Sequence, residues 1–292
     1  MILTCNSTEF KNATQATIFA VMESDGDEYI LEGVSIRCIK GEKIITFIGC
    51  DGYRLSTYSV LIEGEIDKDT QITLPVTWLG EVADSLKLDE VTLDIKLSGI
   101  TIKTKEGVMS SLDKFYKDEY FSIARVKSEP RKFAWQAVLL TEVKINIIKE
   151  LIKVDLQKDL SLDSYNIWLV LSPLGLNVIA KCDEDHLSEG IHIGRIPLQD
   201  VALNSKVYSK YSVVIDARYF FDSIFNSPDT ITIIRGFSSF PDLESIKIFP
   251  NAEVDSEPLE IISYSQKHYQ CITGVTISNK LKYPELFMDE IE

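Results

Sequence analysis

The sequence predicts an α+β protein of two domains that are built in the same way. The chain has 292 residues, of which 45% are hydrophobic and 26% charged, an ordinary globular composition. At roughly 100–200 residues per domain, this length fits two domains. Helix-like and strand-like periodicities alternate along the chain, and the same alternation occurs in each half.

The first half is predicted to contain two helices separated and followed by strands. The first helix spans residues 7–22, with Ser7 or Thr8 as its N-cap. The second spans 75–87 and begins at Pro75, since proline is tolerated in the first turn of a helix. The predicted strands are 29–39, 43–48, 54–62, 90–97, 100–104 and 108–112.

The second half repeats this order. A long helix is predicted over 134–154 and a shorter one over 217–226. Strands are predicted at 165–171, 176–181, 190–196, 212–215, 230–235 and 244–249. Residues 78–95 and 218–234 both read as an amphipathic helix, a polar break and a β-branched strand, which indicates an internal duplication. The polar, proline-containing stretch 126–132 predicts domains 1–128 and 129–292.

Composition disfavours most metalloenzymes and histidine-dependent enzymes. The five cysteines form no C-x-x-C pair, and the chain has three histidines. His186 and His192 lie close to Cys182, Asp183 and Asp185, which is compatible with a metal cluster or with a polar loop that enters a strand; the loop is the favoured interpretation. The sequence contains no phosphate-binding loop, dinucleotide-binding or zinc-protease motif. We therefore expect no cofactor, no metal and no catalytic residues.

The N-terminus lacks the basic and apolar regions of a signal peptide, and no apolar run is long enough to span a bilayer. The sequence thus predicts a soluble, cytoplasmic protein without membrane contact. The formal net charge of −15 argues against holding DNA by overall attraction to phosphate. It leaves open a protein that gathers its few positive charges on one face.

The most informative segment is GCDGYRLS at residues 49–56. An Asp-Gly pair after an apolar strand is usually a plain hairpin turn. In its surroundings, however, the segment resembles A-T-D-G-H-R-L-A in the middle domain of bacterial sliding clamps, the beta subunit of DNA polymerase III. Further similarity to this family lies at residues 9–20, 29–34, 74–75, 114–126, 212–220 and 230–235.

This chain also departs from the family pattern. Tyr53 replaces the family's histidine, and residues 120–123 replace its F-P-D-Y. The resemblance extends to the middle and last of the family's three domains and not to the first. The resemblance implies tandem DNA-clamp domains, each with two helices packed on antiparallel sheets. Residues 1–128 would correspond to the middle domain and 129–292 to the C-terminal domain.

The resemblance implies a non-catalytic processivity factor that encircles duplex DNA. Its partners would be double-stranded DNA, peptides of the polymerase and the clamp loader, and other copies of itself. A two-domain chain would complete a six-domain ring as a trimer, although loss of the first domain could instead leave it monomeric. The alternative is a clamp-like regulatory protein that binds peptides without forming a ring.

The resemblance also implies two sets of functional residues. The first would line an inter-domain groove that binds peptides, although core and turn roles are the competing interpretation: Leu31, Cys50, Gly52, Tyr53, Arg54, Leu55, Phe121, Arg125, Val126, Cys271 and Ile272. The second would face DNA, although lysines are common on the exposed side of any amphipathic helix: Lys11, Lys87, Arg131, Lys132, Lys144, Lys149, Lys153 and Arg218.

Overall fold

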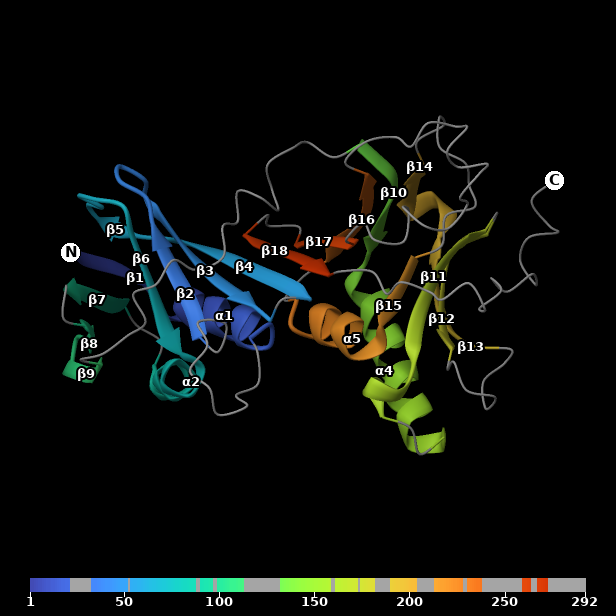
Figure 1. Cartoon of the computed structure of the whole chain (residues 1–292), viewed down its shortest axis with the longest axis horizontal. Coiled ribbons are helices and arrows are strands. Elements are labelled where there is room, and N and C mark those ends of the chain that lie inside the picture. The colour runs from blue at the N-terminus through green and yellow to red at the C-terminus, as the bar shows by residue number, and fades with distance from the viewer. Residues whose placement is uncertain are drawn as a thin grey trace. The chain divides into compact units, whose positions relative to one another are not determined.

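The structure of the chain is a computed structural model. It describes residues 1–21, 33–51, 53–87, 90–96, 99–112, 132–158, 161–172, 174–181, 190–203, 213–227, 230–237, 259–263 and 267–272. The chain divides into two compact units (Figure 1). Unit 1 comprises Met1–Ser128 and Lys267–Tyr269, and unit 2 comprises Glu129–Gln266 and Gln270–Glu292.

Unit 1 contains two helices and two antiparallel groups of strands among its described residues. One group has the order β5-β1-β7-β8-β9, and the other has the order β6-β2-β3-β4. The elements are β1 (Ile2–Asn6), α1 (Ser7–Ile18), β2 (Gly33–Cys38), β3 (Ile44–Cys50), β4 (Arg54–Leu61), β5 (Glu63–Gly64), β6 (Thr70–Pro75), α2 (Val76–Ser85), β7 (Glu90–Lys96), β8 (Gly99–Thr104) and β9 (Gly107–Leu112).

The core of unit 1 draws buried side chains from both helices and both groups of strands. Phe10 of α1 meets Phe47 of β3 edge-to-face, with ring centroids 5.4 Å apart. The N-cap of α1 is Asn6 rather than Ser7 or Thr8, because the Asn6 side chain accepts hydrogen bonds from the amides of Thr8 and Glu9. These contacts fix α1 against the strands that carry the predicted groove residues.

Unit 2 repeats this plan. Its strands have the orders β14-β10-β16-β17-β18 and β13-β12-β11-β15. The helices and strands are β10 (Lys132–Leu139), α4 (Thr141–Lys158), β11 (Asn166–Ser172), β12 (Gly175–Lys181), β13 (Ile191–Pro197), β14 (Val201–Leu203), β15 (Val213–Asp216), α5 (Ala217–Phe225), β16 (Ile231–Phe237), β17 (Leu259–Ser263) and β18 (His268–Ile272), with short 3-10 turns at Leu162–Ser164 and Leu198–Asp200.

The two units therefore share one topology. In each, a strand and a helix are followed by five strands, a second helix and three more strands, with matching neighbours in both groups of strands. Helices α1 and α2 contact each other in unit 1, as α4 and α5 do in unit 2 (Figure 1). The predicted α+β fold class, with paired helices on antiparallel sheets, is confirmed. None of the described helices is long and apolar enough to cross a membrane.

The predicted helix over 134–154 is wrong in its first part. Residues Lys132–Leu139 form β10, and the helix starts only at Thr141. Trp135, Ala137 and Leu139 are all buried, so the apolar spacing at this point is that of a strand. β10 pairs with β14 on one side and β16 on the other, so long-range pairing determines its structure.

Other differences concern strands that the sequence analysis missed and segments that the structure does not describe. The missed strands include β1, β6 and β14. The predicted strand at 244–249 and the first part of the predicted strand at 29–39 lie outside the described residues.

Candidate functional site

The turn between β3 and β4 is built around Asp51. Its Oδ1 atom accepts hydrogen bonds from the backbone amides of Tyr53 and Arg54, both at 2.9 Å. Its Oδ2 atom accepts the Nε–H of Arg54, also at 2.9 Å. An aspartate that binds the amides two and three residues further on stabilises a tight turn. Asp51 therefore fixes both the backbone of the turn and the Arg54 guanidinium group.

The Arg54 side chain is held on a second side by α1 and the residue that follows it. Its guanidinium carbon lies 5.3 Å from the ring centroid of Phe19, the C-cap of α1, in a cation–π arrangement. Only about 10% of the side chain is exposed. This geometry rules out the interpretation of Arg54 as a solvated strand residue. Phe19 is not among the predicted groove residues, because no local pattern connects it to the turn.

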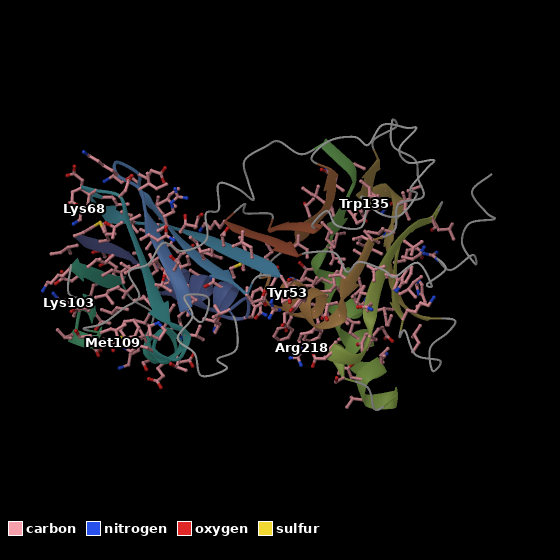
Figure 2. The ribbon with its side chains drawn as sticks, viewed as in Figure 1. Tyr53, Lys68, Lys103, Met109, Trp135 and Arg218 are labelled. Atoms are coloured by element: carbon pink, nitrogen blue, oxygen red, sulfur yellow. The ribbon has the colours of Figure 1, made fainter. Side chains whose placement is uncertain are left out.

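The predicted groove residues near this turn differ in how accessible they are. Tyr53, at the end of the hairpin, is 63% exposed (Figure 2). Cys50 and Leu55 are opposite each other in the strand register, and each is 4% exposed. Neither belongs to the core cluster of unit 1, because alternation along the strands places them on the other face of the sheet. Tyr53 thus offers a large exposed aromatic surface here, and Arg54 lies next to it as a fixed guanidinium group that is about 10% exposed.

The hairpin is attached to the end of α1 by close backbone approach. A Cβ atom on Gly49 would lie 2.1 Å from the carbonyl oxygen of Thr17, so only glycine fits at this position. In β4, opposite Gly49, the Ser56 hydroxyl donates a hydrogen bond to the Ala16 carbonyl. This bond satisfies one of the carbonyls at the C-terminus of α1 that has no partner within the helix.

A short segment from the end of the described chain completes this part of unit 1. The amide of Ser59 donates to the carbonyl of Lys267 at 2.8 Å, and Lys267 Nζ donates to Glu9 at 2.8 Å. The Nε2 atom of His268 lies 2.9 Å from Ser56 Oγ. Burial lowers the pKa of His268 to about 4, against a smaller opposing effect of hydrogen bonding to the Ala16 backbone.

The remaining predicted groove residues cannot be assigned to this site. Leu31, Gly52, Phe121, Arg125 and Val126 lie outside the described residues. Cys271 and Ile272 lie in β18. The groove assignment therefore remains a prediction that rests on the turn.

The predicted DNA-facing residues are distributed over the helices of both units. Lys149 and Lys153 are exposed on α4, where Lys153 pairs with Glu150. Arg218 is exposed on α5 (Figure 2) and pairs with Asp163 at 3.0 Å. In unit 1, Lys11 is partly buried and donates to the Leu86 carbonyl, and Lys87 is exposed beyond α2. In unit 2, Lys132 lies in β10, and Arg131 is outside the described residues.

Lys144 is a correction to this set. Its side chain is buried, and its ammonium group donates to the Ser227 carbonyl at 2.6 Å, just beyond the C-terminus of α5. A cation is favourable at the negative end of a helix dipole. Lys144 therefore joins α4 to α5, and we remove it from the DNA-facing residues.

Acidic residues accompany the exposed cations on these helices. α2 carries Glu81 and Asp84 and no basic residue, whereas α4 carries Glu142, Glu150 and Asp155 among its lysines. The described helices therefore present a mixed surface, which is unsuited to tight phosphate binding by charge alone.

The structure provides no metal cluster among the residues it describes. His192 lies within hydrogen-bonding distance of the Asn177 side chain, at 3.3 Å, and Arg195 also donates to Asn177. His186, Cys182, Asp183 and Asp185 lie outside the described residues, so the choice between a cluster and a polar loop stays a prediction.

Comparison with known proteins finds a sequence-family match and several structural matches, and both kinds of match are to the beta subunit of DNA polymerase III. Residues 4–116 match the sequence model of the family described as DNA polymerase III beta subunit, central domain. A search of curated proteins finds no match. The chain is similar to the solved sliding clamp of Bacillus subtilis, with a TM-score of 0.73 and 13% identity over 95% of this chain and 65% of that one.

Two further solved structures show the same likeness. The beta subunit of Streptococcus pyogenes has a TM-score of 0.71 and 15% identity, over 94% of this chain and 65% of that one. The sliding clamp of Pseudomonas aeruginosa has a TM-score of 0.71 and 14% identity, over 95% and 67%. The chain thus spans about two thirds of the length of these clamps. The resemblance predicted from the sequence is confirmed at the level of the fold.

Proposed function

We propose that the protein is a sliding clamp, because residues 4–116 match the sequence model of the DNA polymerase III beta subunit central domain and the chain has the fold of solved sliding clamps. It would act as a non-catalytic accessory subunit that keeps a DNA polymerase on duplex DNA in the cytoplasm. The observation that carries this proposal is the likeness to solved clamps over 95% of the chain, in both of its repeated units.

Enclosure explains how an acidic protein would stay on DNA. A closed ring cannot leave circular DNA without opening, so retention requires few phosphate contacts. The net charge of −15 and the mixed charges of the described helices agree with weak, sliding contact. Lys149, Lys153 and Arg218 are the exposed helical cations that we propose approach the duplex.

Substitutions in α4 separate DNA contact from structural roles. If Lys149 and Lys153 contact phosphates, Lys149→Gln and Lys153→Gln should each reduce the slope of log affinity against log salt by about 1. Lys144→Gln should leave this slope unchanged and lower the free energy of unfolding by about 1–3 kcal/mol, because it breaks a buried hydrogen bond. Lys68→Glu, an exposed change away from the helices, is the control. Equal slopes for all variants would remove α4 from the DNA-facing surface.

We propose that partner peptides bind beside the β3–β4 turn. Tyr53 offers an exposed ring, and Arg54 is a guanidinium group fixed by Asp51 and Phe19. A rigid aromatic residue beside a pre-positioned polar group is the usual composition of a peptide anchor site. The solved Pseudomonas aeruginosa clamp bound to griselimycin supplies a second probe besides clamp-binding peptides.

Removing the side chain of Tyr53 or of Arg54 should weaken peptide binding without unfolding the protein. We expect Tyr53→Ala and Arg54→Ala each to raise the Kd of a polymerase-derived clamp-binding peptide about tenfold, as loss of one anchor costs roughly 1–2 kcal/mol. Leu61→Ala, which truncates a 69% exposed side chain on the same strand, should leave the Kd unchanged. Calorimetric titration gives the Kd. The site would be rejected if all three substitutions raised the Kd equally, or if none of them changed it.

The ring is tested by the mass of the assembly. A ring of six clamp domains requires three copies of a two-domain chain. We therefore expect the mass measured by light scattering to approach three times 33.0 kDa as the protein concentration rises. A monomeric mass at every concentration would favour the second candidate, a peptide-binding regulator without a ring. That candidate is supported by the mixed charges of the described helices, since α2 carries no basic residue and α4 carries three acidic ones.

A further inference from the structure

One apolar cluster of unit 2 lies on the face of a sheet that points away from the core. Ile167 and Leu169 of β11 belong to the core cluster of unit 2. Trp168, between them, instead packs with its two strand partners, Ile179 of β12 and Val214 of β15. Side chains alternate between the faces of a strand, so these three residues share the outward face of the β13-β12-β11-β15 sheet. We call this surface the Trp168 face.

The Trp168 face is buried although it points away from the core. Trp168, Ile179 and Val214 are 1%, 5% and 4% exposed. Residues on the outward face of an antiparallel sheet reach such burial when another part of the protein lies over them, because strand neighbours shield only their flanks. Lys181 of β12 covers part of the indole, with Nζ 5.0 Å from the ring centroid. Val214 lies on the opposite side of Trp168 from β12, so Lys181 does not account for its burial.

Two cations lie on the β12 and β13 side of the Trp168 face. Lys181 is the first, and the exposed Arg195 is the second. Arg195 Nε donates to Oδ1 of Asn177 at 2.8 Å, and the 0% exposed Asn177 thereby fixes the guanidinium group. Asp216, at the end of β15, is engaged as the N-cap of α5. An apolar segment with several negative charges would complement this face.

The C-terminal residues 285–292 have this composition. Their sequence, ELFMDEIE, contains four apolar residues, four acidic residues and no basic residue. They are part of unit 2, as the Trp168 face is. β18 ends at Ile272, and the twelve residues 273–284 that follow span up to about 40 Å when extended, which is enough to pass from one sheet of a domain to the other.

Other segments of unit 2 outside the described residues fit this face less well. Residues 182–189 contain a single large apolar residue, Leu187, and residues 204–212 contain two lysines and no acidic residue. Residues 238–258 connect β16 to β17, which are neighbours in the other sheet, so both of their ends are tied to that sheet. The C-terminal residues combine the right charge with an end that is free to dock.

We infer that residues 285–292 dock on the Trp168 face. Their apolar side chains cover Trp168, Ile179 and Val214, and their carboxylates pair with Lys181 and Arg195. Docking removes from water an apolar surface that would otherwise promote association with other proteins. The inference is independent of the proposed function, because neither the β3–β4 turn nor the helices take part in it.

Acrylamide quenching of Trp168 fluorescence in the full-length chain tests the docking. The Trp168 signal is the difference between each protein and its Trp168→Phe counterpart. We expect the double substitution Leu286→Ser and Phe287→Ser to raise the quenching constant of Trp168 at least threefold, because the ring then meets solvent. Leu61→Ser, which changes a 69% exposed residue of β4, is the control and should leave the constant unchanged. An unchanged constant in the C-terminal variant would overturn the inference.

Photocrosslinking identifies what lies on the Trp168 face. With p-benzoylphenylalanine at position 287 of the full-length chain, we expect crosslinks to residues 166–181 and 213–216. The same group at position 225, where Phe225 is 60% exposed, should not give them. Lys181→Glu should lower the yield from position 287 at least threefold, and Lys68→Glu should not. Crosslinks from position 287 to other parts of the chain, or none at all, would contradict the docking.

Discussion

Among the described glycines of unit 1, Gly49 is the one at which substitution by alanine is expected to destabilise the fold most. Its Cβ would lie 2.1 Å from the Thr17 carbonyl oxygen, which is backbone and cannot rotate away. Either α1 or β3 must then move, and overpacking of this kind costs about 3 kcal/mol. The position also adjoins the Asp51 turn, so peptide binding at Tyr53 and Arg54 should weaken together with stability.

Urea denaturation measures this effect, and Gly80→Ala is its matched control. Gly80 lies within α2, and a Cβ there would meet no atom within 4 Å. The same substitution should raise the free energy of unfolding by about 0.5–1 kcal/mol, because alanine favours the helix. Similar unfolding midpoints for the two variants would contradict the close packing of β3 on α1.

The second large effect is acid sensitivity from His268. Burial places its folded-state pKa at about 4, below an unfolded value of about 6.5, so the folded state favours the neutral ring. The neutral His268 ring makes its full contribution to the free energy of unfolding above about pH 6.5. This contribution is lost as pH falls towards 4, because His268 of the unfolded chain binds a proton at a higher pH than His268 of the folded chain. This difference amounts to on the order of 3 kcal/mol. Lys267, the residue before His268, forms an ion pair with Glu9, and these are the charged groups next to His268 in this part of unit 1.

The difference between wild type and His268→Gln isolates this residue from the carboxylates that titrate nearby. The variant should be less stable at pH 7, where it loses the contact with Ser56 and the packing against Tyr58. The difference in free energy of unfolding between the wild-type protein and this variant should become smaller as pH falls from 6.5 to 4. A gap that stays constant over this range would show that His268 is not buried in its neutral form.

Local features were the ones that the sequence could predict. The turn at Asp51 depends on contacts within three residues, and so its motif was visible in the sequence. Helix α2 and the hairpin strands β3 and β4 likewise follow from local periodicity and turn residues. The duplication was visible because both halves repeat the same order of elements.

Features that depend on distant partners could not be predicted. Lys144 looks like any exposed helical lysine, and its burial depends on Ser227, 83 residues away. His268 contacts Ser56 across 212 residues, without a local signal. The helix predicted from residue 134 is wrong over the length of β10, because the two strands that pair with β10 come much later in the chain. Tertiary contacts, rather than propensity, decided all three.

The measurement that tests the sliding-clamp proposal most directly is retention on DNA of different topology. The labelled protein is loaded onto nicked circular DNA by a bacterial clamp loader with ATP, separated from free protein, and the DNA is then cut once. We expect the protein to stay on the circle at a salt concentration that screens phosphate contacts and to leave after linearisation. Retention that is equal on circular and linear DNA, or absent from both, would contradict a clamp that encloses the duplex.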